Sequence, residues 1–564
     1  MTCLIKYDIL VVMKMRVEYI KRPYKDKVYS YPFLVTSYRD ENKVPRNKVV
    51  QNLSHLPEHV VEAIRIALRS GGEVKSVPTD VIKYLNSIPF GEIWAVWCVM
   101  KDLGIQDALE SLPENHKIPI IASICDRVIN PKPYSKRALW DAFEDTSLKQ
   151  LLGVDERISL SEWYEALDSL YLHQMEIQKQ LFSGSTERLY LYDITSTYFE
   201  GKCCPLADWG LDRDNKKGKK IIVIGLLTTS EGRPIAVRVF RGNTSDQTTV
   251  IDQIKELKEE FRIEQMIFVG DRGMITSKRI SELESGDFHW IKYITAIKRQ
   301  EMMALVEDQE HPIELGLFDH RNLVEIKEGG KRYILCHNPL RKAEDECTRL
   351  RLLAKTEGKL REIESSVKAA RLKKEEKIAR RLYRWINKWK MERFFPVKYG
   401  EGYFEFSRDE DEIERYSVLD GCYVIVSNVD EKELDTETVH SKYKDLKYVE
   451  NAFRSMKVSD LCVRPVRHWS ENRVRGHVFM CMLAYLVVWE VKHRLNPMLE
   501  RDPKTRECEG NSLREIWDTL KHITIGKLNI GGTKTTQIST VNKRQREILK
   551  LLQAPINKKA KQAL

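Results

Sequence analysis

The segment Leu189-Tyr-Leu-Tyr-Asp-Ile-Thr-Ser-Thr-Tyr-Phe199 decides the fold of this chain. It is rich in aromatic, aliphatic and β-branched residues, which favour a β-strand. Asp193 stands in its middle, although Asp is depleted in strands because its short side chain competes for backbone hydrogen bonds. An acid at the centre of the best-defined strand is therefore a candidate for chemistry.

The residues that follow this strand predict a mixed sheet with flanking helices. Further strands are expected at 220–229, 235–241, 266–269 and 290–297, with helices starting near Thr244 and Ser277 and a late helix from about Thr436 to Met456. Three antiparallel strands continued by strand–helix–strand units is the element order of the RNase H fold. The predicted class is therefore α/β, with an RNase H-like core that an insertion splits and a mainly helical N-terminal region.

A chain of 564 residues predicts two to four folding units. Short strands are expected at Ile9–Met13, Lys27–Tyr38 and Val44–Leu53, followed by helices as far as residue 185. Two more strands are expected near Tyr333–Cys336 and Cys422–Ser427. The expected parts are an N-terminal region of short strands and then helices (1–185), the first part of the core (186–297), a basic insertion (298–430), the second part of the core (431–495) and a small helical C-terminal region (496–564).

Composition predicts a soluble protein of a reducing compartment. Charged residues make up 31% of the chain, and the longest apolar run, Val478 to Val488, is shorter than the roughly 18–20 residues that span a bilayer. The N-terminus shows no signal-peptide pattern. The 11 cysteines contain no CxxC pair, which favours reduced cytosolic thiols over a zinc site.

The positive charge is concentrated in one segment. The whole chain has a net charge of +11, and residues 341–400 hold 19 Lys and Arg against 9 Asp and Glu. This segment also carries a heptad-like apolar series from Leu353 to Trp389, which predicts a helical hairpin. Such a concentration favours a polyanionic partner, although a solvated pair of charged helices explains it equally well. The candidate DNA-binding cations of this hairpin are Arg380, Arg381, Arg384 and Lys388.

A second acid, Asp271, lies just past the strand 266–269, where α/β folds place ligand-binding groups. In an RNase H-like sheet this strand neighbours the strand of Asp193, so the two carboxylates are expected to converge. Paired carboxylates repel unless a cation neutralises them, and hard oxygen ligands favour Mg²⁺, with Mn²⁺ as a substitute. Two ions about 3.5–4 Å apart are expected, one activating the attacking hydroxyl and one stabilising the leaving oxygen.

The late helix supplies a third carboxylate, Glu450. It belongs to a stripe with helical spacing that is unusual for a core, because it mixes an acid with an aromatic ring and cations. The stripe consists of Tyr443, Leu446, Glu450, Phe453 or Arg454, and Lys457. It suits a helix that follows a phosphate backbone while one carboxylate reaches a metal ion. The alternative is an ordinary amphipathic helix with ion pairs.

These motifs together resemble the IS4-type DDE transposases, and most of all the IS1634 family. The resemblance rests on Tyr192–Tyr198, Gly242–Asp246, Val269–Gly273, the set Tyr443, Glu450 and Lys457, Val463–Trp469 with His477, and, near the N-terminus, Tyr31–Leu53 and Pro131–Lys136. It covers most of the chain.

The resemblance implies that Asp193, Asp271 and Glu450 are catalytic metal ligands, with Mg²⁺ as the working ion and transposon-end and target DNA as substrates. It also implies a homodimer or larger synaptic complex in a prokaryotic cytoplasm, associated with the nucleoid. The reaction would be cleavage at transposon ends and transfer of the freed 3′-hydroxyl into target DNA. The open alternatives are an RNase H-like nuclease without strand transfer and an inactive DNA-binding descendant.

One position departs from the family signature, which has Arg where this chain has Leu446. Lys442, Lys444 and Lys447 are candidates to replace its phosphate contact. The resulting set of expected DNA contacts on the late helix is Tyr443, Lys447, Arg454 and Lys457.

Four further aromatic and imidazole side chains have more than one interpretation. His468 and His477 are expected to have structural or DNA-contact roles rather than to act as a general base. Trp209 and Trp469 are candidates to stack on distorted DNA. Core packing is the favoured interpretation for both tryptophans.

Overall fold

The computed structural model describes residues 15–556, except 25–26, 41–43, 70–81, 183–187, 202, 212, 214–217, 245–264, 272–279, 282–289, 308–322, 460–462, 464–465, 500–511 and 531–532. The expected strand Ile9–Met13 and most of the helices expected after Thr244 and Ser277 lie outside the described residues. The chain forms two compact units, one of residues 1–90 with 523–541 and the other of residues 91–522 with 542–563.

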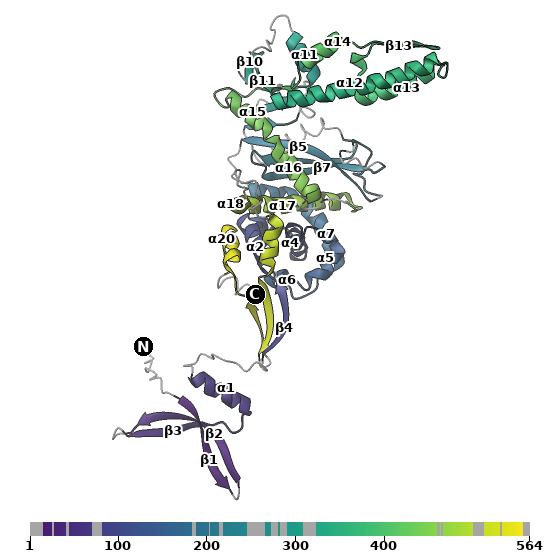
Figure 1. Ribbon diagram of the computed structural model, residues 1–564. Helices are drawn as coiled ribbons and strands as arrows, with labels where there is room; N and C mark the ends of the chain where they lie inside the picture. The colour runs from purple at the N-terminus through teal and green to yellow at the C-terminus, as the bar shows by residue number, and fades with distance from the viewer. Residues whose placement is uncertain are drawn as a thin grey trace. The chain divides into compact units, whose positions relative to one another are not determined.

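The first unit contains two small antiparallel sheets and one helix (Figure 1). Strand β2 pairs with β1 on one side and β3 on the other, and β15 pairs with β4 and β16. The bounds are β1 Met15–Tyr24, β2 Lys27–Arg39, β3 Pro45–Asn52, α1 Glu58–Arg69, β4 Ile82–Pro89, β15 Thr524–Ile530 and β16 Thr533–Ile538.

The strands β4, β15 and β16 correct two expectations. Helices were expected around residues 82–89, and the C-terminal region was expected to be helical. Instead Pro89 pairs with Thr524, more than four hundred residues later in the chain. Pairing over such a sequence distance overrides local propensity and leaves no local signal. The two compact units divide near residue 90, and the functional boundary expected at residue 185 stays a prediction.

The second unit is built on a mixed sheet of eight strands within the described residues. Strands β5, β6 and β7 are antiparallel, and β8 and β9 continue the sheet parallel to β5. The order is β10-β11-β14-β9-β8-β5-β6-β7. The bounds are β5 Leu189–Tyr198, β6 Ile221–Thr229, β7 Pro234–Arg241, β8 Met266–Val269, β9 Ile291–Ala296, β10 Leu323–Glu328, β11 Lys331–His337 and β14 Cys422–Ser427.

This arrangement confirms the predicted α/β class with a mixed sheet. Strands β8 and β14 have the predicted bounds. The expected insertion, however, is not wholly separate from the sheet. Its strand β14 pairs antiparallel with β9, so β10, β11 and β14 extend the same sheet beyond β9. Strand β10 was not predicted, because its alternating polar residues do not stand out from the loops.

A layer of helices packs beside this sheet, and α17 lies between the two (Figure 1). Helix α17 contacts β7 as well as α4 and α7. It is long and apolar enough to span a membrane, but 83% of its most apolar window is buried inside the protein, as expected for a core helix. The bounds are α2 Gly91–Asp102, α3 Ile105–Ala108, α4 Glu114–Ile129, α5 Lys136–Phe143, α6 Ser147–Leu151, α7 Leu160–Leu172, α8 Gln174–Phe182, α17 Glu471–Arg494, α18 Asn496–Leu499, α19 Leu513–Lys521 and α20 Lys543–Leu551.

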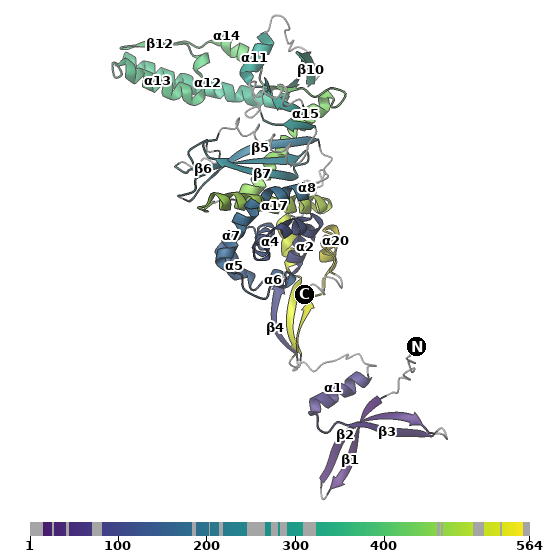
Figure 2. The same cartoon turned by 180° about the vertical axis from the view of Figure 1, so that it is seen from behind.

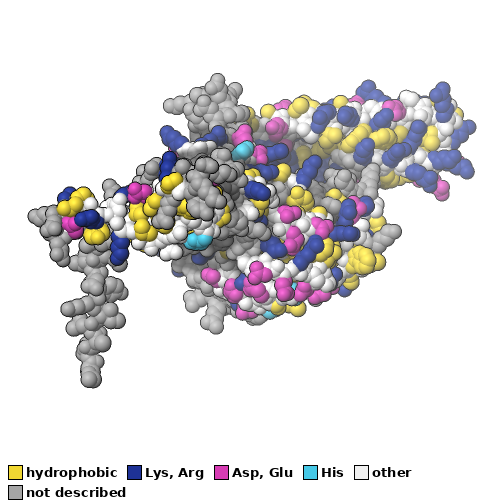
Figure 3. Space-filling view, turned by 90° about the horizontal axis from the view of Figure 1, so that it is seen from below, with side chains coloured by type: hydrophobic (Ala, Val, Ile, Leu, Met, Phe, Trp, Pro, Cys, Tyr) yellow, Lys and Arg dark blue, Asp and Glu magenta, His cyan; other side chains and the backbone are white. Residues whose placement is uncertain are grey.

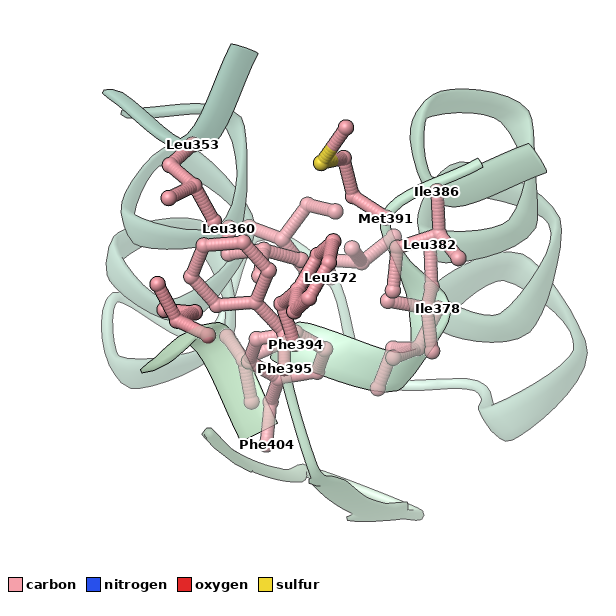
Figure 4. Packing of buried hydrophobic residues seen from close by; sticks show 13 residues of the cluster. Leu353, Leu360, Leu372, Ile378, Leu382, Ile386, Met391, Phe394, Phe395 and Phe404 are labelled. Atoms are coloured by element: carbon pink, nitrogen blue, oxygen red, sulfur yellow. The ribbon is translucent and has the colours of Figure 1, made fainter. Parts of the chain in front are cut away.

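The predicted helical hairpin is present as α12 (Pro339–Lys368) and α13 (Glu375–Trp389), which run side by side away from the sheet (Figures 1 and 2). We call residues 339–389 the arm. Apolar side chains of both helices, with the small hairpin β12 (Val397–Gly400) and β13 (Tyr403–Phe406), form a core of their own (Figure 4). Helices α11 (Arg299–Glu307) and α14 (Glu410–Ser417) flank the arm in sequence.

The late helix is interrupted, which corrects the expected single helix from Thr436 to Met456. It consists of α15 (Thr436–Lys444), α16 (Leu446–Arg454) and a π-helical turn, η6 (Ser455–Ser459). The break falls at Asp445, which ends α15 and begins α16. Helix α16 packs on β5 and β6.

Candidate active site

Asp193 lies in β5, which pairs with β8 on one side and with β6 on the other. Apolar side chains bury this strand on both faces, while Asp193 itself is half-buried. Its carboxylate accepts a hydrogen bond of 2.8 Å from the Ile194 amide. Burial, together with the charges of Asp271 and Glu450, raises the pKa of Asp193 to about 7, against the opposing effects of the Ile194 amide hydrogen bond and of Arg213.

The register of the sheet places Asp271 level with Asp193. Strand β8 is the parallel neighbour of β5, with Val269 opposite Leu191. Asp193 and Asp271 each lie two residues beyond this pair, so the two acids are at the same level along adjacent strands. Asp271 is exposed, because β8 ends at Val269.

Glu450 comes from α16, the helix that packs across β5 and β6. The buried face of this helix consists of Val449, Ala452 and Phe453, and Glu450 stands exposed beside it. Its charge acts on Asp193. The structure therefore brings the three predicted acids into one electrostatic neighbourhood, and their role as metal ligands stays a prediction.

Arg213 is a member of this neighbourhood that the sequence did not reveal. It follows β5 in a connection, and its amide donates a hydrogen bond of 2.9 Å to Ser196 Oγ. Its guanidinium donates to the Ile194 carbonyl, and its charge lowers the pKa of Asp193. No local motif marks this arginine, since it acts through the fold of the loop after β5.

The residues expected to contact DNA on the late helix differ in their surroundings. Lys457 donates hydrogen bonds to Thr195 Oγ1 and to the Ser196 carbonyl of β5. The ring of Tyr443 lies 6.2 Å from that of Tyr423. The two others, Lys447 and Arg454, are exposed, with the Lys447 ammonium 4.9 Å from the ring centre of Tyr448. For all four, DNA contact remains a prediction.

The donor chemistry of the three acids fits a hard divalent cation. The charges of Asp271 and Glu450 raise the pKa of Asp193, so a cation that neutralises the carboxylates would stabilise the group. In the described part of the chain, no three acidic, cysteine or histidine side chains are close enough together to hold an ion. The segment 272–279, directly after Asp271, is outside that part.

Four exposed cations lie along α13, and we call them the α13 cations: Arg380, Arg381, Arg384 and Lys388. Trp385 and Trp389 stack beside them with ring centres 5.3 Å apart. The charged groups of Arg384 and Lys388 lie 5.4 and 5.2 Å from the ring centre of Trp385. Figure 3 shows Lys and Arg side chains gathered along the arm.

Trp209 and Trp469, the two candidates for stacking on DNA, correct an expectation. Core packing was favoured for both, but Trp209 is 61% exposed and Trp469 is 76% exposed. Both follow segments that pair at the end of β5, where Asp208 pairs with Ile221 and Val466 with Phe199.

Comparison with known proteins identifies the class of this chain. Residues 187–487 match the family model described as Transposase DDE domain. This match covers just over half of the chain, which therefore belongs to the DDE transposases, enzymes that cut and join DNA and use divalent metal ions. Residues 17–77 match the model described as IS1634 family transposase, N-terminal domain. The protein is thus an insertion-sequence transposase close to IS1634, as the sequence motifs predicted.

Among solved structures, the chain is similar to one described as "Cryo-EM structure of piggyBac transposase synaptic complex with hairpin DNA (SNHP)". The identity is 10% and the TM-score 0.36, and the likeness covers 78% of this chain and 82% of that chain. No curated protein matches the chain.

Proposed function

We propose that this transposase cleaves transposon ends with Asp193, Asp271 and Glu450 and transfers the freed strand into target DNA. In cleavage, a water oxygen forms a bond to phosphorus and the 3′ oxygen leaves as a hydroxyl. In transfer, that hydroxyl attacks a target phosphodiester and displaces the target's own 3′ oxygen. Phosphoester bonds are exchanged, so neither an oxidant nor a reductant is needed.

The observation that carries this proposal is that the acids lie at the same level of the sheet. Asp193 and Asp271 follow paired residues of adjacent parallel strands, and α16 brings the charge of Glu450 to the same place. The strand order β7-β6-β5-β8-β9, with three antiparallel strands and two parallel additions, is the order expected of an RNase H-like core. The strands of residues 298–430 then form an insertion that extends this core.

The three carboxylates would hold Mg²⁺, most simply as two ions that activate the attacking oxygen and stabilise the leaving one. The residues around them have separate tasks. Arg213 supports the backbone of β5 at Ile194 and favours the charged form of Asp193. Lys457 ties the turn after α16 to β5, which fixes Glu450 relative to Asp193.

DNA would be held by other parts of the chain. The first unit, which contains the IS1634-type N-terminal match, would recognise transposon ends, and the α13 cations would bind phosphates without sequence preference. Pairing of two ends for strand transfer implies a homodimer or larger synaptic complex that works at the nucleoid.

The test replaces each acid by its amide, which keeps the shape and removes the charge. Asp193→Asn, Asp271→Asn and Glu450→Gln are each expected to abolish Mg²⁺-dependent cleavage of end-containing DNA while DNA binding persists. Glu437→Gln, an exposed acid of α15, is the matched control and is expected to cleave normally. A variant that cleaves at a wild-type rate would remove its residue from the site.

The same assay separates the alternatives. Joined products from a pre-cleaved end with a free 3′-hydroxyl show a transposase that completes strand transfer. Nicking without joined products would identify a nuclease only, and binding without any nicking in Mg²⁺ or Mn²⁺ would identify an inactive descendant.

A further inference from the structure

A pocket of about 500 Å³ in the helical layer joins two motifs that the proposed chemistry does not use. One motif, Pro131–Lys136, connects α4 to α5, and the other, Val463–Trp469, leads into α17. The pocket is lined by Arg127, Lys132, Lys136, Arg467, His468 and His477, among others. We call this site the basic pocket.

The basic pocket is strongly cationic. Its described lining residues include four Lys or Arg side chains and no Asp or Glu. Asp126, the neighbour of Arg127 in the sequence, accepts hydrogen bonds from Asn130 and from the Tyr134 amide. Burial and the charge of Arg127 lower the pKa of Lys136 to about 7. The Lys136 ammonium donates a hydrogen bond of 2.9 Å to Ser123 Oγ. The site thus bears a positive potential that an anion would relieve.

His477 forms the buried wall of this pocket. It is 5% exposed, and its Nε2 lies 3.0 Å from the Val463 carbonyl, so Nε2 carries the proton. None of the described residues forms a hydrogen bond with its buried Nδ1. A protonated His477 would donate from Nδ1 to an anion. Burial and the charges of Arg127, His468 and Lys136 keep its pKa well below the ordinary value until such an anion arrives.

The surroundings of the basic pocket suit a nucleic-acid strand. Two aromatic side chains adjoin its cations in sequence and are exposed, Tyr134 by 51% and Trp469 by 76%. Val466 pairs with Phe199, which follows Asp193 by six residues along β5, about 20 Å at ~3.3 Å per residue. That distance corresponds to roughly six phosphate steps along one DNA strand.

We propose that the basic pocket binds a backbone phosphate of the DNA that the active site cuts, several nucleotides from the cleaved bond. The proposal rests on the proposed transposase function. Lys132 and Arg467 contact the phosphate from the rim, and Lys136 and His477 from inside. Tyr134 and Trp469 offer ring faces for neighbouring bases.

The salt dependence of DNA binding tests whether Lys132 and Arg467, at the rim of the pocket, contact a phosphate. The full-length chain carrying Lys132→Gln and Arg467→Gln, both at exposed positions, is titrated with a random-sequence DNA duplex at several salt concentrations. The slope of log K against log salt is expected to become shallower by up to ~0.9, the contribution of one neutralised phosphate. The control Lys101→Gln with Lys179→Gln removes two exposed lysines of α2 and α8 that lie outside the pocket and is expected to keep the wild-type slope.

The pH dependence of DNA affinity tests whether Lys136, inside the pocket, contacts the phosphate. Lys136 faces Arg127 and Asp126 of α4, His468, and His477 and Cys481 of α17. A bound phosphate raises the pKa of Lys136, so binding takes up a proton and DNA affinity falls by up to about tenfold per pH unit above about pH 7. Lys136→Arg keeps its charge throughout, and this variant is expected to bind at pH 7 like the wild type and to lose less affinity up to about pH 9. A lysine with a purely structural role would leave the two pH profiles parallel.

Three outcomes overturn the proposal. They are an unchanged salt slope in the rim variant, parallel pH profiles, and saturable binding of inorganic phosphate in ³¹P NMR without any effect of the rim variant on DNA. The last result would identify a small-anion site. Each is independent of cleavage, so a wild-type chain that fails to cut DNA counts against the proposed function and not against the pocket.

Discussion

The α13 cations offer the sharpest test of how this protein holds DNA. They are exposed, and their positions lie along a helix whose apolar side packs into the core of the arm. Replacing all four by Gln removes charge from the surface while Ile378, Leu382 and Ile386 keep their packing. Surface changes of this kind alter stability by only about 0.5 kcal/mol each. The variant is therefore expected to fold, and its defect is expected in DNA binding.

The size of that defect follows from counterion release. If each of the four cations neutralises one phosphate, the slope of log K against log salt becomes shallower by about 3.6, at ~0.9 per phosphate. Between ~50 and ~200 mM salt, the wild-type affinity then falls about 150-fold more than that of the variant. The loss is expected to be equal for end-containing and random duplexes, because phosphate contacts carry no sequence information.

Fluorescence anisotropy with both duplexes over this salt range measures the slopes. The matched control replaces Arg341, Arg361 and Lys368, cations of α12 that already pair with acids of the same helix. Their replacement is expected to change the slope less. Equal slopes in the wild type and the α13 variant would refute the reasoning and show that this surface is only solvated or serves protein contacts.

Three further predictions concern the core and the late helix. Lys457→Met is expected to lower the free energy of unfolding by about 1–3 kcal/mol in urea denaturation and to leave the DNA salt slope unchanged; a shallower slope would show a phosphate contact instead. Gly476→Ala is expected to cost about 3 kcal/mol in thermal denaturation, because the new Cβ would lie 1.9 Å from a carbonyl of α7, whereas Gly358→Ala, with open space around it, is expected to be neutral or stabilising. Lys447→Ala is expected to weaken retention of cleaved ends in gel shifts, and adding Leu446→Arg to restore part of it through a bidentate phosphate contact; unchanged retention would refute this.

The sequence predicted those elements whose signal is local. Strands β5, β6, β7 and β8 consist of apolar and β-branched runs between turn residues, so their types and most of their ends followed from the residues themselves. The arm followed from its apolar repeat, and Leu353, Leu360 and Ile378 are indeed buried in its core. The order of the strands then suggested that Asp193 and Asp271 would be neighbours, and the register agrees.

What depends on distant pairing could not be predicted. Strand β4 pairs with β15 across most of the chain, and β14 joins the main sheet although it follows the whole arm. Arg213 reaches the site because its loop folds back on β5, which no spacing reveals. The exposure of Trp209 and Trp469 is similarly a result of where their neighbours pair, since large aromatic residues are usually buried.

The late helix shows how a pattern drawn on one continuous helix can misplace the neighbours of a candidate acid. A continuous helix would align Tyr443, Glu450 and Lys457 on one stripe, all facing DNA. The helix is broken at Asp445, and the π-helical turn at Ser455–Ser459 changes the phase of the side chains that follow, because a π turn needs more residues than an α turn. Phe453 packs in the core on the same face of α16 as Val449 and Ala452, and Lys457, within the π-helical turn, donates to β5. Glu450 lies between these two irregularities, so they determine together where its carboxylate stands relative to Asp193. Lys457 is then better understood as a residue that positions the site than as one that reads the DNA backbone.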